Sequence, residues 1–407
     1  MMKSFLSCFV TTRTKKSIIQ ALVCFLFGCQ FSFLVCCYSD IIFYHHQGEE
    51  NIKVEIEVKD DLLNKVDYNL LNELTELTQG QSTLSCPEPL VPFYDHIINH
   101  DDGGRKHSSA RDYCDHHDDH FKCWGQIPKI IHFTTKSRCI PPDQMEYIDR
   151  WKMQFPNASI FLHDDDAIDR LIYNNEWDEF KDLHAIMPCV MKGAMLTDIW
   201  RILVVYKYGG LYTDLDNWPL DPFNESMIPN NVTFFSFSDA YNRPKQSLFA
   251  AEASFSGFIM MLHLILKSVK DLPNISTPKL LWTTGPHMFG RGFRYFLDDE
   301  SKKKYKEGNR KKMKEENHDG YLTSMFQQPI LKVPGPYDKY VLPKINYDDI
   351  VQSHFNTTKN MTRRERIMEE NGIVHWQKEI FLNNKRKVEK ISCQSKMAEA
   401  NSLSRQK

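Results

Sequence analysis

The chain has 407 residues, of which 42 % are hydrophobic and 26 % charged, and its formal net charge is −2. This hydrophobic content allows a sizeable core in one large domain or two ordinary ones, and it excludes a globally disordered chain. The nearly balanced charge gives no basic excess, so nucleic acid is not expected as a partner.

An apolar run without formal charge occupies residues 18–38, directly after the basic residues Arg13, Lys15 and Lys16. As a helix this run would span about 31 Å, the thickness of a hydrocarbon core. Because basic residues favour the cytoplasmic side, we expect a single transmembrane signal-anchor, with residues 1–17 as a cytosolic tail and the rest in the lumen. A cleaved signal peptide is the alternative, although its apolar region is usually shorter.

The segment after this run carries the features of a lumenal chain. Six cysteines follow it, and their pairing is not determined by the sequence. Residues 39–125 are polar and are predicted to form a largely unstructured stem, whose Asp- and His-rich tract at 95–120 is interpreted as a solvated spacer. Glycosylation signals of the form Asn-x-Ser/Thr stand at Asn157, Asn224, Asn231, Asn274, Asn356 and Asn360.

A catalytic domain is expected over residues 126–385, followed by a polar tail at 386–407. Strands and helices alternate at its start, which predicts an α/β fold with a parallel sheet. The helix predicted over residues 189–208 ends at Gly209-Gly210. Strands are predicted at 127–133, 158–163, 211–216, 233–237, 249–253 and 373–376, and the other helices at 143–155, 164–173, 257–269 and 285–297.

Two pairs of charged residues lie around the Gly209-Gly210 step. Asp214 and Asp216 stand two apart near a strand end, so their carboxylates are expected to face one cleft. A cation between them would relieve their repulsion, and oxygen ligands suit Mn²⁺ or Mg²⁺. Asp198 and Arg201 share one face of the preceding helix and are interpreted as facing the same cleft. An isolated ion pair at the domain edge is the alternative.

These residues lie in two stretches that together resemble the signature of glycosyltransferase family 32, namely Thr197-Asp198-Ile199-Trp200-Arg201 and Tyr208-Gly209-Gly210-Leu211-Tyr212-Thr213-Asp214-Leu215-Asp216. Three shorter segments are similar to other parts of the family pattern: residues 127–132, Thr284-Gly285-Pro286 and Val374-His375-Trp376. The family includes yeast-type initiating α-1,6-mannosyltransferases and inositol-phosphoceramide mannosyltransferases. Thr134 and Thr135 stand where many relatives have a tryptophan, so the base of the nucleotide is left open.

The resemblance implies a GT-A fold, a Rossmann-like nucleotide-sugar-binding sandwich, in a type II protein of the Golgi membrane. The implied activity is a retaining transfer of a hexose, mannose favoured, from GDP-mannose or a UDP-sugar to a glycan or glycolipid hydroxyl. The implied catalytic residues are Asp198, Arg201, Asp214 and Asp216. The residues implied to contact the donor are His132, Thr134, Asp198, Arg201, Tyr212, Asp214 and Gly285.

The resemblance also implies that Mn²⁺ or Mg²⁺ is bound by Asp216, Asp214 and His375, with His354 as a competing ligand. Two other classes of function stay open. A catalytically inactive sugar-binding or scaffold protein could use the same fold. A metal-dependent phosphohydrolase would need more ligands, around two metals, than the sequence supplies.

Overall fold

A computed structural model describes residues 70–79, 85–93, 114, 123–191, 193–239, 241–275, 279–305, 321–333 and 391–404. The chain divides into two units, Met1–Asn64 and Lys65–Lys407, and all described residues belong to the second. The predicted cytosolic tail, the apolar run at 18–38 and the strand at 373–376 lie outside these residues. Among the residues that are described, no helix combines the length and apolar character needed to cross a membrane.

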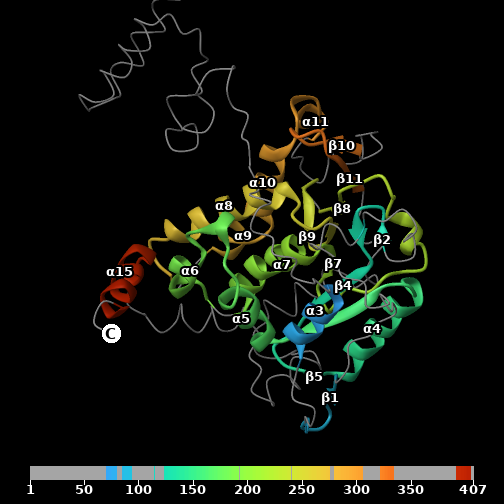
Figure 1. Cartoon of the computed structure of the whole chain (residues 1–407), viewed down its shortest axis with the longest axis horizontal. Coiled ribbons are helices and arrows are strands. Elements are labelled where there is room, and N and C mark those ends of the chain that lie inside the picture. Colours follow the sequence, from blue (N-terminus) through green and yellow to red (C-terminus); the bar gives the residue numbers. More distant parts are fainter. Residues whose placement is uncertain are drawn as a thin grey trace, which may run out of the picture. The chain divides into compact units, whose positions relative to one another are not determined.

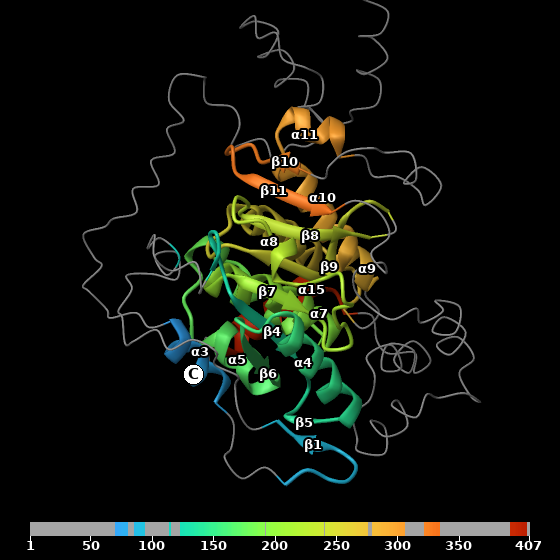
Figure 2. The ribbon, with the colours of Figure 1, turned by 90° about the vertical axis from the view of Figure 1, so that its right-hand side faces the viewer.

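A seven-stranded sheet with the order β10-β11-β8-β9-β7-β4-β6 forms the centre of the second unit. Figure 2 shows the strands following one another in this order from top to bottom. The strands are β4 (Ile130–Thr134), β6 (Ser159–His163), β7 (Gly210–Thr213), β8 (Phe234–Ser238), β9 (Pro244–Ala251), β10 (Tyr321–Thr323) and β11 (Pro329–Val333).

The sheet is mixed, whereas the sequence predicted a parallel one. β4 pairs in parallel with β6 and β7, and β11 pairs in parallel with β8. β9 instead runs antiparallel to both β7 and β8, because the short connection between Ser238 and Pro244 makes β8 and β9 a hairpin. The α/β class is confirmed, and the antiparallel pairings correct the predicted sheet type.

Helices cover both faces of the sheet (Figure 1), with α7 and α8 to the left of the strands and α4 to the right. Successive residues of β4 alternate between two cores, as expected for a strand buried on both sides: Ile130 packs with α7 and α8, and Ile131 with α4. The helices are α4 (Pro142–Gln154), α5 (Asp165–Tyr173), α6 (Leu183–Ile186), α7 (Ala194–Tyr208), α8 (Ser256–Lys270), α9 (Leu280–Thr283), α10 (Pro286–Phe296) and α11 (Asp299–Lys304).

The helix α7 begins later than the predicted start at residue 189 and ends where predicted. Pro188 lies in a short 3-10 segment, Met187–Cys189, and Gly193 has a φ of 84°, so the backbone leaves the helical path before Ala194. At the other end, Gly209 and Gly210 have φ values of 68° and 95°. A Cβ on Gly210 would lie 2.6 Å from the carbonyl oxygen of Ile130, so only glycine lets β7 start this close to β4.

Part of the segment predicted to be an unstructured stem is folded onto the domain. The helix α3 (Leu70–Thr78) buries its leucines in the same core as α5 and α7, and its Glu73 accepts a hydrogen bond from the Tyr208 hydroxyl at 2.9 Å. Three short strands, β1 (Val91–Pro92), β2 (Cys123–Trp124) and β3 (Ile127–Pro128), also precede the sheet, and β1 pairs with β5 (Cys139–Ile140). The leucines of α3 recur at helical spacing, a signal that the overall polar composition of the segment does not reveal.

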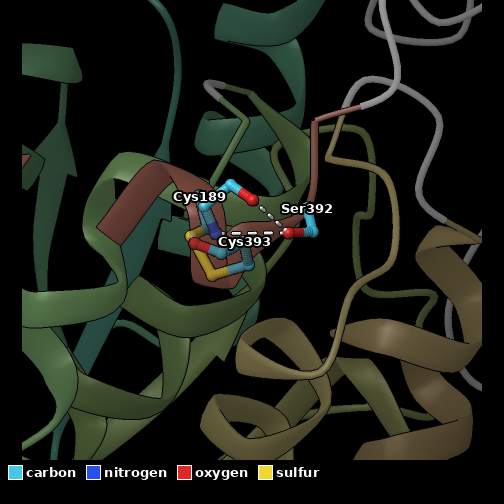
Figure 3. Close-up of a disulfide and its surroundings, with 4 residues drawn as sticks. Cys189, Ser392 and Cys393 are labelled. Carbon is cyan, nitrogen blue, oxygen red and sulfur yellow. Dashed lines mark hydrogen bonds between the residues drawn. A yellow bond between two sulfur atoms is a disulfide. The ribbon is translucent and has the colours of Figure 1, made fainter. Parts of the chain in front are cut away.

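Three disulfides connect separate segments, and all six cysteines that follow residue 38 take part: Cys86 with Cys139, Cys114 with Cys123, and Cys189 with Cys393. The last of these attaches α15 (Cys393–Ser404), part of the predicted polar tail, to the segment before α7 (Figure 3). Cys393 is fully buried, and its amide donates to the carbonyl of Leu272 at 3.0 Å. The C-terminal segment is therefore part of the core.

Removing the disulfide between Cys189 and Cys393 should destabilise the domain by about 2–5 kcal/mol. The bond closes a separation of 204 residues and so restricts the unfolded chain strongly. Urea unfolding of the Cys189→Ala/Cys393→Ala variant measures the loss. The Cys114→Ala/Cys123→Ala variant is the control, because its bond spans only 9 residues and should cost less. Equal losses in the two variants would contradict the loop-closure argument.

Candidate active site

Arg201 joins the two pairs of charged residues singled out by the sequence. Its Nη2 lies 3.3 Å from Oδ1 of Asp198, one turn earlier on α7, and its Nη1 lies 3.2 Å from Oδ1 of Asp214, which follows β7. Only 8 % of Arg201 is exposed. Asp198 and Arg201 therefore do not form an isolated surface pair, because the guanidinium bridges two carboxylates from different elements.

Tyr212 holds the same group from the strand side. Its hydroxyl donates to Oδ1 of Asp214 at 2.6 Å, and its ring lies below the Arg201 guanidinium at 4.8 Å. Tyr212 is fully buried between Trp200 and Phe249. The predicted donor residue Tyr212 is thus placed to fix Asp214 and Arg201 relative to each other.

Gln246 and Thr284 complete the cluster. We call the six residues together the Arg201 cluster: Asp198, Arg201, Tyr212, Asp214, Gln246 and Thr284. The Thr284 hydroxyl donates to Oδ2 of Asp198 at 2.8 Å, and Nη1 of Arg201 donates to the carbonyl of Gln246 at 3.0 Å. The Gln246 side chain donates to the carbonyl of Thr284 at 3.0 Å. The sequence indicated Thr284 only through the resemblance of Thr284-Gly285-Pro286 to a family segment, and no local sequence pattern indicates Gln246.

Asp214 and Asp216 lie in a turn, not in a strand as predicted. β7 ends at Thr213, and the amide of Asn217 donates to the carbonyl of Asp214 at 2.9 Å to close the turn. The Asn217 side chain donates to the carbonyl of Ser247 at 2.8 Å and so fastens the turn to β9. This turn leaves Asp216 exposed and Asp214 half-buried, so the two carboxylates meet solvent differently.

Burial and crowding shift the pKa values in the cluster. Burial raises the pKa of Asp198 to about 6, and the Arg201 charge and the Thr284 hydrogen bond offset this only in part. Burial and the nearby Asp216 raise the pKa of Asp214, against the influence of Arg201 and Tyr212. For Arg201, burial is outweighed by Tyr212, Asp214, Asp198 and Asp216, which raise its pKa and keep it charged.

The turn is suited to a divalent cation that shares its ligands with a substrate. The mutual repulsion of Asp214 and Asp216 is the kind of strain that a cation relieves. Mg²⁺ and its relatives often take one or two carboxylates and complete their coordination with substrate phosphates. Within the described ranges, no three His, Cys, Asp or Glu residues group closely enough to hold a metal by themselves. His375 and His354 lie outside these ranges.

His132 lies beneath the Gly209-Gly210 step, and a contact of this residue with the donor stays a prediction. It is fully buried, its Nε2 donates to the carbonyl of Gly209 at 2.9 Å, and its Nδ1 lies 3.2 Å from Nε2 of His163. Both ring nitrogens thus contact protein atoms, which makes this histidine part of the support under β7.

The other two predicted donor residues lie at element ends. Thr134 is the last residue of β4 and is half-buried, opposite His163. Gly285 directly precedes α10 and follows Thr284, and its amide donates to the carbonyl of Leu280 at 2.9 Å. Gly285 is therefore next in the chain to Thr284 of the Arg201 cluster. Contacts of Thr134 and Gly285 with the donor stay predictions.

Folding stability should fall in mild acid because of His132. Burial lowers its pKa to about 4, against the weaker opposing effect of the hydrogen bond to Gly209. The unfolded chain, with a pKa near 6.5, binds the proton first, so stability is full above about pH 6.5 and is lost as the pH falls towards about 4. The loss is on the order of 3 kcal/mol.

Urea midpoints measured from about pH 7.5 to about pH 4.5 test this, because the slope of stability against pH should flatten in a His132→Gln variant. His263→Gln is the control, since the His263 side chain is exposed and its lowered pKa should contribute less. An unchanged slope in His132→Gln would show that other groups govern the acid sensitivity.

Comparison with known proteins identifies part of the chain. Residues 141–234 match a family model described as a glycosyltransferase sugar-binding region containing a DXD motif. Over 106 residues the chain is 31 % identical to the initiation-specific alpha-1,6-mannosyltransferase of Schizosaccharomyces pombe, covering 25 % of each protein. Over 202 residues it is 27 % identical to inositol phosphoceramide mannosyltransferase 3 of the same organism, covering 42 % of this chain and 54 % of that one.

Among solved structures, the chain matches the PaToxG Glycosyltransferase with a TM-score of 0.31 and 16 % identity, over 42 % of this chain and 68 % of that one. This likeness is too low to carry an argument about the site. The chain spans a quarter and about half of the lengths of the two curated relatives. The matched region contains Asp198, Arg201, Asp214 and Asp216, and the resemblance to family 32 is confirmed.

Proposed function

We propose that this chain, which carries a glycosyltransferase sugar-binding region with a DXD motif, is a metal-dependent retaining glycosyltransferase. It transfers a hexose from a nucleotide-sugar to a glycan or glycolipid hydroxyl. Mannose from GDP-mannose is the first choice, since both curated relatives are named mannosyltransferases, and a UDP-sugar is the alternative. The proposed location is the Golgi lumen, with a type II membrane anchor at residues 18–38.

The observation that carries this proposal is the buried bridge from Asp198 through Arg201 to Asp214, within the matched region. A guanidinium with a planar fork and a nearby carboxylate recognise sugar hydroxyls and phosphate oxygens well. A buried arrangement of this kind is preorganised, so little reorganisation is needed when charge develops in the transition state. A protein that served only as a scaffold would have no need for it.

A divalent cation, Mn²⁺ or Mg²⁺, would be held by Asp216 and Asp214, with His375 as the predicted third ligand. When bound, it offsets the charge that develops on the donor diphosphate as the sugar–phosphate bond breaks. Asp216 is the more exposed carboxylate and is proposed to face the bound donor. Asp214, tied to Arg201 and Tyr212, links this turn to the rest of the cluster.

Asp198 and Arg201 are proposed to hold the hydroxyls of the donor sugar and to orient its anomeric carbon. Thr284 and Gln246 keep these two side chains in place, through the hydroxyl of Thr284 and the carbonyl of Gln246. Retention implies that the acceptor hydroxyl attacks from the face that the diphosphate leaves.

Asp216→Ala should lower transfer from GDP-mannose by about 100-fold or more, because it removes a charge that binds the cation. The melting temperature should stay close to that of the wild type, since Asp216 is exposed in a turn. Chelator should silence the wild type, and Mn²⁺ should restore it. Asp221→Ala, an exposed carboxylate in the following loop, is the control and should keep full activity. Full activity of the wild type in chelator would overturn the metal-dependent mechanism.

Arg201→Lys should lower kcat/KM by roughly 30- to 1000-fold, because lysine keeps the charge but cannot contact Asp198 and Asp214 together. Initial rates over a series of donor concentrations measure this loss. Arg150→Lys, at an exposed arginine on α4, is the matched control and should not change the rate. If Arg201→Lys transfers sugar at the wild-type rate, the fork has no role in catalysis, and the inactive sugar-binding interpretation gains support.

A further inference from the structure

The short helix α9 presents two large apolar side chains to solvent. Leu281 is 59 % exposed and Trp282 is 57 % exposed. The Trp282 ring stacks on His287 of α10, with centroids 3.4 Å apart and planes inclined by 17°. The stack supports the indole from one side, so Trp282 offers a flat and fixed apolar surface. Neither core cluster includes this side chain.

This surface is connected to the Arg201 cluster by the chain itself. Trp282 stands two residues before Thr284, whose hydroxyl donates to Asp198 and whose carbonyl accepts from Gln246. Figure 2 shows α9 beside β9, the strand that carries Gln246. The backbone of Trp282 is therefore two residues from a member of the Arg201 cluster.

The connection between the two is rigid. The amides of Thr284 and Gly285 both donate to the carbonyl of Leu280, at 3.1 and 2.9 Å, and this closes the end of α9. A Cβ on Gly285 would lie 3.0 Å from that carbonyl oxygen, so a larger residue would require the turn to shift by a few tenths of an ångström. Pro286 then begins α10 with its φ already fixed. Trp282 and Thr284 thus keep a constant relation to each other.

We propose that Trp282, supported by His287, is the platform on which a pyranose ring of the acceptor stacks. This inference rests on the proposed function and adds the recognition of the acceptor, outside the matched region at 141–234. One face of a hexose carries mainly C–H groups and fits a flat indole, while its hydroxyls stay in water at the edge. Tryptophan supplies such a surface at low entropic cost, because only two torsions are fixed.

A saccharide fits this surface better than a lipid bilayer does. Binding to a membrane surface needs an extended apolar face flanked by several basic residues. The helix α9 and its preceding residue offer two exposed apolar side chains, Leu281 and Trp282, and one exposed lysine, Lys279. The small flat area, on the turn that also carries Thr284, favours a single sugar ring.

The test compares transfer and donor hydrolysis in the full-length chain. The probes are GDP-mannose with three acceptors: methyl α-D-mannopyranoside, methyl β-D-glucopyranoside and methyl β-D-galactopyranoside. For whichever acceptor the wild type uses, Trp282→Ala should raise the acceptor KM by about tenfold or more. Donor hydrolysis and the donor KM should stay near wild type, because the donor site is unchanged. Trp282→Phe keeps a smaller ring and should show an intermediate KM.

Tyr173→Ala is the matched control, since Tyr173 is 54 % exposed and stacks on His184 with planes inclined by 20°, but it lies on α5. Its kinetics should equal those of the wild type. His287→Ala keeps the indole and removes its support, so a smaller rise in acceptor KM is expected. This second variant also serves if Trp282→Ala does not fold, as judged by its melting curve.

An unchanged acceptor KM in Trp282→Ala overturns the platform, and so does a parallel loss of donor hydrolysis, which would place Trp282 in the donor site. Binding to phosphatidylcholine–phosphatidylserine vesicles that is lost in Trp282→Ala, with acceptor KM unchanged, would assign the surface to lipid instead. If the wild type uses no nucleotide-sugar, the proposed function fails separately. Saturation-transfer NMR with the same methyl hexosides then decides, since a signal lost in Trp282→Ala supports the platform and no signal overturns it.

Discussion

The site depends on one buried guanidinium, that of Arg201, which two carboxylates share. Arg201 reaches Asp198 within its own helix and Asp214 beyond the following strand, so α7 and β7 must hold a fixed relation. A buried charge without partners is strongly unfavourable, and each of these three groups has a further partner: Thr284 for Asp198, Tyr212 for Asp214 and the Gln246 carbonyl for Arg201. Tyr212 adds a ring below the guanidinium and a hydroxyl for Asp214, which fixes the arrangement from the strand side.

The Gly209-Gly210 step makes this relation possible. The positive φ values of both glycines let the chain leave α7 and enter β7 without an intervening loop, and their lack of a Cβ lets it pass close to Pro128 and Ile130. The carbonyl of Gly209 accepts a hydrogen bond from His132, which ties the step to β4. A longer connection would leave Arg201 and Asp214 free to move relative to each other.

The surrounding elements bring the substrate side of the site together. β9 supplies the Gln246 carbonyl and the Ser247 carbonyl, which hold Arg201 and the turn after β7. The α9–α10 corner supplies the Thr284 hydroxyl to Asp198 and carries the exposed Trp282 two residues before Thr284. One rigid corner thus connects the Arg201 cluster to an exposed aromatic surface, an arrangement that would suit the proposed transfer between two substrates.

The sequence by itself determined the α/β class, the helices α4, α5, α7, α8 and α10, and the residues at the centre of the site. Helical spacing paired Asp198 with Arg201, and the two glycines marked the end of α7, because both signals are local. Tertiary structure decided the antiparallel β9, the disulfide partners, the packing of α3 and α15, and the parts played by Gln246 and His132. These features depend on contacts between segments far apart in the chain, and local residue spacing does not determine which segments come into contact.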